Sequence, residues 1–377
     1  MCRVFSFRLN WNLATNRLSA MAAEKRRAGA HILDLTESNP TRAGLDYPRS
    51  IVDALADERI LRYDPDPRGV ASAREAVSAY YRGEIAASRI ILTASTSEAY
   101  SFLFKLLADP GDEVLTPRPS YPLFDYLASL ESVVTKQYPL RYDGSWHIDF
   151  DTLEKSVTSR TQAIVVVNPN NPTGSFLKHS ELERLESLGV PLISDEVFSD
   201  YAFAPDPASV DSLAGSRRTL TFSMSGLSKI AGLPQMKLGW IVASGPGHEE
   251  ALDRLELIAD TYLSVSTPVQ LALPKLLLSS MGDQIRHRTS ANLKLLRAAA
   301  ASSPLQALNV EGGWYATLQV PRIRSEEDWA LLLLAEHDVL VQPGFFFDFE
   351  SEAFLVISLL TPPEVFAEGV RRIIGAM

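Results

Sequence analysis

The sequence predicts an α/β fold in which a mostly parallel sheet is covered by helices and joined to a smaller α+β domain. Between residues 90 and 242, short apolar runs alternate with stretches of helical periodicity. Strands that are apolar on both faces are typical of parallel sheets buried between two layers of helices. The chain has 377 residues, which is too long for one small domain and favours two.

The individual elements can be placed by their periodicity. The large sheet is expected to contain the runs 90–92, 113–115, 163–167, 191–193, 219–222 and 239–242. Helical patterns lie at 17–26, 51–59, 71–81, 97–107, 123–130 and 179–188, and a long helical stretch at 249–278 is bent near Pro268 and Pro274. A helix at 284–301, strands near 315–320 and 354–360 and terminal helices follow.

These patterns divide the chain into three parts. An N-terminal arm and helix at 1–35 should pack with the small domain. The large domain is expected at 36–280 and the small C-terminal domain at 281–377.

Composition and charge exclude several classes of function. The chain carries 36 basic and 46 acidic residues, so its net charge is 36 − 46 = −10. Such a field disfavours nucleic acid or an anionic membrane as the main partner. The only cysteine is Cys2, so no disulfide framework is expected. The N-terminal segment is interrupted by Arg3 and Arg8 and does not resemble a signal peptide. No apolar run reaches the roughly 18 residues of a membrane-spanning helix. We therefore expect a soluble, cytoplasmic protein.

Lys229 follows an apolar run and a turn that contains Ser223, Ser225, Gly226 and Ser228. A turn of small hydroxyl residues suits a phosphorylated ligand, and a lysine whose pKa is lowered by its surroundings can form a Schiff base. For a single lysine, the more common interpretation is a solvated loop residue. The functional interpretation therefore depends on the other loops at the same edge of the sheet.

Three further polar segments follow predicted strands. The residues 95–97, Ser-Thr-Ser, stand at a helix start, where free N–H groups can bind an anion, although such residues are more often a plain helix cap. The segment 168–174, Asn-Pro-Asn-Asn-Pro-Thr-Gly, is more specific, because an ordinary turn needs one or two such residues. Asp195 ends another strand, where it could cap the chain or pair with a cationic heterocyclic nitrogen.

Taken in order, these segments resemble the class I and II aminotransferases, which are pyridoxal-phosphate enzymes of fold type I. The matching segments are 63–69, 93–99, 110–114, 119–122, 171–174, 195–196, 228–229 and 312–313, and the resemblance extends from about residue 35 to the C-terminus. It implies pyridoxal 5'-phosphate as the cofactor. It also implies the transfer of an amino group from an amino acid or amine donor to a keto acid or aldehyde acceptor through a Schiff base on Lys229.

The resemblance also implies a role for each matching residue. Lys229 would bind the cofactor covalently and move the proton, while Asp195 would keep the pyridine nitrogen protonated. Tyr121 would stack on the ring and Asn171 would hydrogen-bond its 3' oxygen. Tyr63 would reach the phosphate of the neighbouring subunit, which implies a homodimer with shared active sites. The phosphate would be held by Ser95, Thr96, Ser97, Ser225, Ser228 and Lys237. No metal site is expected.

Two cofactor positions depart from the family pattern. Lys237 stands where the family usually has an arginine, so a positive charge is kept but the bidentate fork is lost. Phe198 stands where the family has a tyrosine that donates to the 3' oxygen.

The third departure concerns the substrate. Val356 occupies the position of the family arginine that binds the substrate carboxylate, an interaction of about 2–5 kcal/mol in a closed site. Either another cation takes over, with Arg42 in the loop that contains Ser38 as first candidate, or the amino substrate has no carboxylate there. Trp11, Trp314 and Tyr315 could line such a pocket or belong to the core.

Two other functions remain to be weighed against the aminotransferase. A fold-type-I lyase or cyclase would use the same residues, because the reaction depends on which bond of the substrate is aligned with the ring. A cofactor-binding protein without activity would be expected to lose Lys229 or Asp195, and both are present. Site residues, and not the fold alone, therefore favour the transferase.

Overall fold

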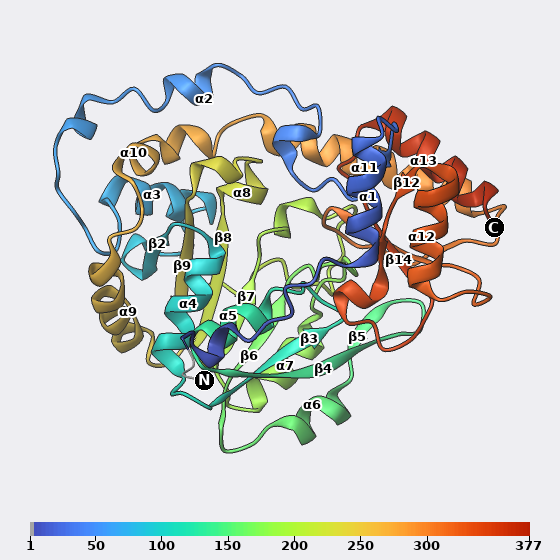
Figure 1. Ribbon diagram of the computed structural model, residues 1–377. Helices are drawn as coiled ribbons and strands as arrows, with labels where there is room; N and C mark the ends of the chain where they lie inside the picture. Colours follow the sequence, from blue (N-terminus) through green and yellow to red (C-terminus); the bar gives the residue numbers. More distant parts are fainter. Residues whose placement is uncertain (1–3) are drawn as a thin grey trace.

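The computed structural model describes residues 4–377, so that Cys2 and the start of the predicted arm lie outside the described residues. In the described part of the chain, the larger sheet has eight strands in the order β2-β9-β8-β7-β6-β3-β4-β5 (Figure 1). The strands are β2 (Ile90–Thr93), β3 (Glu113–Arg118), β4 (Val134–Tyr142), β5 (Trp146–Ile148), β6 (Thr161–Val167), β7 (Leu192–Asp195), β8 (Thr221–Gly226) and β9 (Gly239–Ser244).

Most neighbours in this sheet run parallel, which confirms the predicted fold class. The four pairs that join β4, β3, β6, β7 and β8 are parallel. Strand β9 is antiparallel to both β8 and β2, and β5 is antiparallel to β4. The carboxyl ends of β2, β3, β6, β7 and β8 therefore lie at one edge of the sheet.

Helices cover both faces of the large sheet. On one face lie α4 (Thr96–Leu107), α5 (Phe124–Leu130) and α9 (His248–Tyr262). The other face is covered by α6 (Phe150–Ser156), α7 (His179–Ser187), α3 (Ala71–Tyr80), α8 (Leu227–Ile230) and α10 (Thr267–Leu276). Strand β2 shows why both layers are needed: Ile91 packs into the first layer, and Ile90 and Leu92 pack into the second.

The smaller domain is built on a four-stranded sheet in the order β10-β11-β14-β13, within the described residues. Its strands are β10 (Gln306–Ala307), β11 (Tyr315–Gln319), β13 (Gln342–Pro343) and β14 (Phe354–Ser358). A parallel pair, β1 (Leu33–Asp34) with β12 (Val339–Leu340), lies beside it. The helices of this part are α1 (Arg17–Arg27), α11 (Met281–Ala300), α12 (Glu326–His337) and α13 (Pro363–Gly375).

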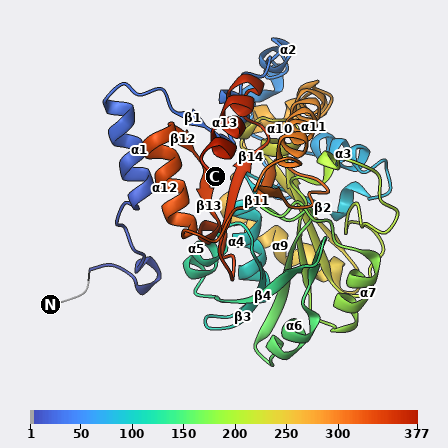
Figure 2. The same ribbon diagram turned by 90° about the vertical axis from the view of Figure 1, so that its right-hand side faces the viewer.

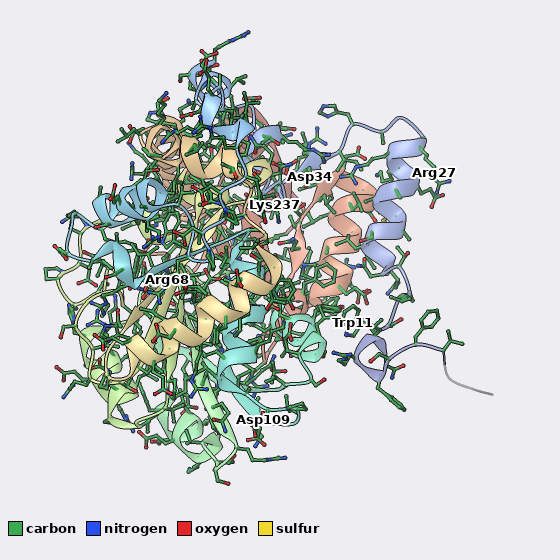
Figure 3. The ribbon with its side chains drawn as sticks, turned by 90° about the vertical axis from the view of Figure 1, so that its left-hand side faces the viewer. Trp11, Arg27, Asp34, Arg68, Asp109 and Lys237 are labelled. Carbon is green, nitrogen blue, oxygen red and sulfur yellow. The ribbon has the colours of Figure 1, made fainter. Side chains whose placement is uncertain are left out.

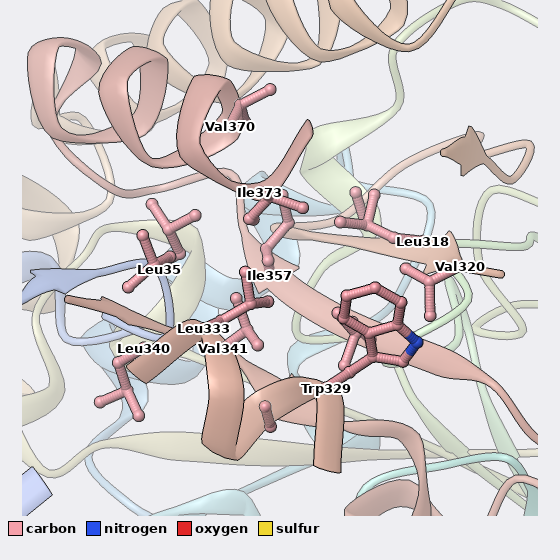
Figure 4. Close-up of a cluster of buried hydrophobic side chains, with 14 of the residues drawn as sticks. Leu35, Leu318, Val320, Trp329, Leu333, Leu340, Val341, Ile357, Val370 and Ile373 are labelled. Atoms are coloured by element: carbon pink, nitrogen blue, oxygen red, sulfur yellow. The ribbon is translucent and has the colours of Figure 1, made fainter. Parts of the chain in front are cut away.

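The N-terminal helix belongs to the core of the small domain. Figure 2 shows α1 beside α12, and Leu18 and Ala22 of α1 are buried in the same cluster as Trp329 of α12. Figure 4 shows the centre of this cluster, where Trp329 and Ile357 lie between helices and sheet. The division at residues 35 and 280 stays a prediction.

Three parts of the sequence prediction differ from the structure. Strands β4 and β5 and helix α6 were not expected, because the 134–142 run is mostly polar or partly exposed and carries no continuous apolar signal. The expected helix at 249–278 is two helices, because Leu263 adopts a left-handed conformation with φ 45° and α10 begins at Thr267. The pattern at 51–59 gives only α2 (Ser50–Asp53) and a 3₁₀ turn, η3 (Glu58–Leu61).

Short 3₁₀ turns complete the description. They are η1 (Phe7–Leu9), η2 (Pro40–Arg42), η4 (Ala87–Arg89), η5 (Ser199–Tyr201), η6 (Pro234–Met236) and η7 (Gly344–Phe347). Among the described residues, no helix combines the length and hydropathy that crossing a lipid bilayer requires.

Candidate active site

The polar loops singled out in the sequence meet at one edge of the large sheet. Thr93 at the end of β2 lies opposite Gly239, and Gly239 lies opposite Gly226 at the end of β8. Val167 at the end of β6 lies opposite Asp195 at the end of β7. The segments 95–97, 168–174, 195–196 and 225–229 therefore begin side by side, where ligands bind in sheets of this type.

Lys229 lies in the single turn of α8, directly after β8. Its backbone carbonyl accepts a hydrogen bond of 2.6 Å from the Tyr201 hydroxyl. Its Nζ lies 5.2 Å from the ring centre of Trp314 and 5.8 Å from that of Phe198. Burial lowers the pKa of the Lys229 amine, and the Asp195 carboxylate opposes this shift. A less basic amine is a better nucleophile at neutral pH.

Asp195 is held by two donors at the end of β7. The Tyr100 hydroxyl donates to Oδ2 at 3.1 Å, and the Val197 N–H donates to Oδ1 at 3.3 Å. Burial raises the pKa of Asp195 to about 6, although these donors and Lys229 partly counteract it. A cationic group bound next to the Asp195 carboxylate would stabilise its charged form.

Tyr100 was not found by sequence reasoning. It lies on α4, one turn after the predicted phosphate-binding residues, and only 3% of its surface is exposed. The signal was a tyrosine on the sheet-facing side of a helix, because a buried hydroxyl requires a partner.

The predicted phosphate-binding residues surround the start of α4. Ser95 caps this helix and accepts from the Glu98 N–H at 3.2 Å, while Thr96 and Ser97 form its first turn. Gly239 lets the neighbouring loop approach, because a methyl group there would lie 3.0 Å from the Ser225 carbonyl oxygen and 3.3 Å from the Ser95 carbonyl carbon. The structure thus brings 95–97 and Ser225 together at the positive end of a helix dipole.

The remaining candidate phosphate-binding residues come from β8, from α8 and from the turn before β9. Ser225 is fully buried and its hydroxyl donates to the Glu196 carbonyl at 3.5 Å, while Ser228 precedes Lys229 in α8. Lys237 is exposed, with a left-handed φ of 51°, just before β9 (Figure 3). Lys237 precedes Gly239 by two residues and is the only charged residue among the candidate phosphate-binding residues.

The 168–174 loop holds a buried polar group that has no partner in the described chain. The Asn171 amide oxygen is buried and has no hydrogen-bond partner in residues 4–377. Because the oxygen and nitrogen of an amide are assigned from their partners, this group can present either a donor or an acceptor. An unpartnered buried amide costs about 1–3 kcal/mol, which a bound molecule would recover. Burial raises the pKa of the Tyr121 phenol, and the Asp195 carboxylate lies close enough to add to this shift, although 45% of the residue is exposed.

Together, these groups match pyridoxal 5'-phosphate in kind. They offer a half-buried amine for an aldehyde, a carboxylate for a pyridine nitrogen, an amide for a ring oxygen, and hydroxyls at a helix start for a phosphate. The described residues thus offer a partner for the aldehyde, the ring nitrogen, the ring oxygen and the phosphate, although Phe198 supplies no second donor to the ring oxygen.

The substrate candidates are distributed around this site. Arg42 is exposed at the end of η2, and its guanidinium has no hydrogen bond or ion pair to the described residues. Ser38 lies within hydrogen-bonding reach of the Tyr315 phenol, whose pKa burial raises to about 12. Val356 is fully buried in β14, opposite Thr317 of β11. Thr317 donates to the Pro172 carbonyl at 3.5 Å, which places this face of the small sheet against the Asn171 loop.

Of the three candidate aromatic residues, two lie near the site. Trp314 is fully buried, contacts Phe198 and lies beside Lys229, so it belongs both to the core and to the site. Tyr315 follows it in β11. Trp11 packs on Tyr126 of α5, with 4.9 Å between ring centres, in the arm that Figure 3 shows outside the main body.

The comparison with known families decides the identity of the chain. The family described as aminotransferase class I and II matches residues 30–373. The chain belongs to the class I and II aminotransferases. These enzymes depend on pyridoxal 5'-phosphate, which supplies an electron sink for the carbanion formed at the substrate.

Individual relatives agree with this assignment. This aminotransferase is 28% identical to the tyrosine aminotransferase of Homo sapiens over 348 residues, which cover 87% of the chain and 76% of the relative. It is 30% identical to the glutamate-pyruvate aminotransferase AlaA of Escherichia coli over 65% of the chain and 63% of the relative. The solved alanine aminotransferase of Pyrococcus furiosus has the same fold, with a TM-score of 0.88 at 24% identity over 99% of each chain.

Phe198 offers a test of the second departure from the family pattern. Its ring is buried beside Lys229, and the family resemblance predicts that a tyrosine in its place would add a donor to the cofactor's 3' oxygen. In the expected Schiff base on Lys229, such a donor would stabilise the ionised oxygen and so favour loss of the proton. We expect the visible absorbance of the bound cofactor to titrate at a higher pH in the wild type than in Phe198→Tyr. An equal or lower titration pH in the wild type would contradict this role.

Proposed function

We propose that this aminotransferase carries its cofactor as a Schiff base on Lys229 and uses the same amine to move the substrate proton. The observation that supports this most is the half-buried amine of Lys229, which lies beside Trp314 and Phe198 and close enough to Asp195 for their charges to interact. Asp195, Asn171, Tyr121 and the hydroxyls around Ser95 would hold the ring and phosphate. Each of these groups binds or orients, and Lys229 alone exchanges a proton with the reacting carbon.

The donor is proposed to be an amino acid whose carboxylate binds Arg42. Arg42 supports this because it is a cation without a partner in the described chain, at the end of the loop that contains Ser38. Val356 cannot supply a charge, so an amino acid must find its cation elsewhere. Relatives named as tyrosine and glutamate-pyruvate aminotransferases support amino acid and keto acid substrates.

A substrate panel tests both the reaction and Arg42. The holoenzyme is mixed with amino acids and with matched amines, and the cofactor absorbance is followed without an acceptor. We expect amino acids to convert the cofactor to its amine form, and Arg42→Ala to lower this rate about 10- to 100-fold, as expected for a charged hydrogen bond. The exposed Arg49, which lies seven residues after Arg42 and is paired with Asp53, provides a control as Arg49→Ala. A response to amines that Arg42→Ala leaves unchanged would reject the carboxylate role, and loss of the amino compound without formation of the amine cofactor would favour a lyase.

The chain is also proposed to form a cytoplasmic homodimer with shared active sites. Tyr63 supports this because 83% of its surface is exposed in a single chain, as is 84% of Leu61 beside it. The N-terminal arm adds exposed apolar side chains, with Phe5 at 76% and Phe7 at 80%. Exposed apolar groups of this kind mark surfaces that another chain covers.

The mass of the holoenzyme in solution tests the dimer. We expect light scattering to give twice the 41.5 kDa of one chain. In a dimer, Tyr63→Phe should weaken cofactor binding about 3- to 10-fold, the range for one hydrogen bond, without changing the mass. A stable monomer with full cofactor affinity would contradict the shared site.

A further inference from the structure

The small sheet presents one of its faces to the active site. Ala316, Leu318, Leu355 and Ile357 of β11 and β14 point into the buried cluster of the small domain. Side chains alternate along a strand, so Tyr315, Thr317, Val356 and Ser358 lie on the opposite face. That face approaches the Asn171 loop through Thr317 and the Ser38 side chain through Tyr315.

Gln342 lies on this same face, at the side of the substrate loop. It stands directly opposite Val356 in the pairing of β13 with β14, so the order across the sheet is Thr317, Val356, Gln342. The chain of the 33–39 segment passes beside it, because the Leu35 N–H donates to the Leu340 carbonyl and the Ser358 N–H donates to the Leu35 carbonyl. Gln342 is thus placed between the buried valine and the loop that contains Ser38.

The amide oxygen of Gln342 is not used within the described chain. Its Oε1 is buried, and it has no hydrogen-bond partner in residues 4–377. A buried amide oxygen without a partner is unfavourable, and groups of this kind are rare unless a ligand or water completes them.

A cavity lies next to this amide. It has a volume of about 190 Å³ and lies between α1 and the β12–β13 segment. A water molecule occupies about 30 Å³ in the liquid, so the cavity is large enough for several atoms of a ligand. Leu18, Ala22, Leu340 and Phe346 give it apolar walls, and Thr36 and Gln342 add neutral polar groups.

The charges around the cavity favour a neutral ligand. Arg26 lines it, but its guanidinium is paired with the Asp34 carboxylate at 2.9 Å. The half-buried Glu37 carboxylate follows Thr36 and acts on the Tyr315 phenol. A carboxylate entering here would meet a paired cation and an acid, whereas an amide or hydroxyl could both donate to and accept from Gln342.

We propose that Gln342 determines substrate specificity by binding an uncharged polar group on the side chain of the amino substrate, which would extend toward the partly open cavity between α1 and β13. This inference rests on the proposed function, since the substrate must be seated on the cofactor at Lys229. It assigns the substrate class as amino acids with a carboxamide or hydroxyl side chain, and it leaves the α-carboxylate to Arg42.

Three probes of similar length test this assignment in the holoenzyme: L-glutamine, L-glutamate and L-norleucine. Conversion of the cofactor to its amine form is followed by absorbance with each probe, without an acceptor. We expect kcat/KM for glutamine to exceed that for glutamate and for norleucine by about 10-fold. Gln342→Met keeps the length of the side chain but removes the amide. It should therefore lower kcat/KM for glutamine about 3- to 10-fold and leave kcat/KM for norleucine unchanged or improved.

Two further variants separate specificity from folding. Gln306→Met, on an exposed position of the same sheet, should change none of the three rates. Gln342→Glu should lower kcat/KM for glutamate further, because the two carboxylates repel each other. It should leave kcat/KM for norleucine within about 3-fold of the wild-type value. A preference for glutamate in the wild type, equal loss of all three rates in Gln342→Met, or reaction with other amino acids but none of these three would overturn the proposal. Absence of reaction with every amino compound would reject the proposed function instead.

Discussion

Lys229→Ala is expected to lower turnover by at least about 10⁴-fold. The change removes the nucleophile that is proposed to hold the cofactor and also the group that exchanges a proton with the substrate, and general acid–base catalysis alone contributes about 10²- to 10⁴-fold. The amine lies beside Trp314 and Phe198, and its neighbours cannot replace it, because neither has a titratable group.

The covalent link to the cofactor provides a second measurement. Reduction of the wild-type holoenzyme with borohydride should add the mass of the cofactor to the peptide that contains Lys229, and the alanine variant should show no addition there. Lys294→Ala, on an exposed position of α11, serves as the control and should behave like the wild type. Turnover within 10-fold of the wild type in Lys229→Ala would show that another residue performs this chemistry.

Asp195→Asn is expected to lower turnover on the order of 10³-fold, since it removes the charge that would keep the pyridine nitrogen protonated. The amide has the same shape and can still meet the Tyr100 hydroxyl and the Val197 N–H. A variant that folds normally but loses activity would therefore show that the charge of Asp195, and not its packing, is required.

The same variant is expected to stabilise the cofactor-free chain at neutral pH. Burial raises the pKa of Asp195 from 3.8 to about 6, so the folded chain holds this proton more tightly than the unfolded chain. The stability that this carboxyl contributes is present below about pH 4 and is lost as the pH rises to about 6. Because asparagine does not ionise, the melting temperature of the cofactor-free variant should equal that of the wild type near pH 4 and exceed it at pH 7.5. A lower melting temperature at pH 7.5 would show that the carboxylate is not under electrostatic strain.

Much of the architecture could be predicted from the sequence, because apolar periodicity reports burial. The runs around Ile164 and Ile193 are buried on both faces, and the structure has strands there. The pattern fails for β4, where Val134 and several later side chains are partly or largely exposed. It also fails near Leu263, because a left-handed residue that ends a helix leaves no trace in hydropathy.

The candidate site could also be predicted only in part from the sequence. The loops that begin at Ser95, Asp195 and Lys229 follow strands, so their meeting at one edge follows from the order of the strands. Tyr100, Tyr201 and Gln342 could not be predicted in this way, because their contacts depend on how helices and the small sheet pack on the large domain. A partner that is distant in sequence gives no local signal.

The alternation of β11 and β14 has a consequence for how enzymes of this kind can diversify. Residues such as Leu355 and Ile357 hold the small domain together, and their neighbour Val356 lies on the opposite face of the sheet, which we propose faces the site. Selection can therefore exchange the side chains on one face for new substrates while the other face keeps the domain folded. Insertion of a single residue in β14 would have the opposite result, since it would send the site-facing residues into the core. We expect lineages of this scaffold to vary by substitution at these alternate positions and to keep the length of the strand constant.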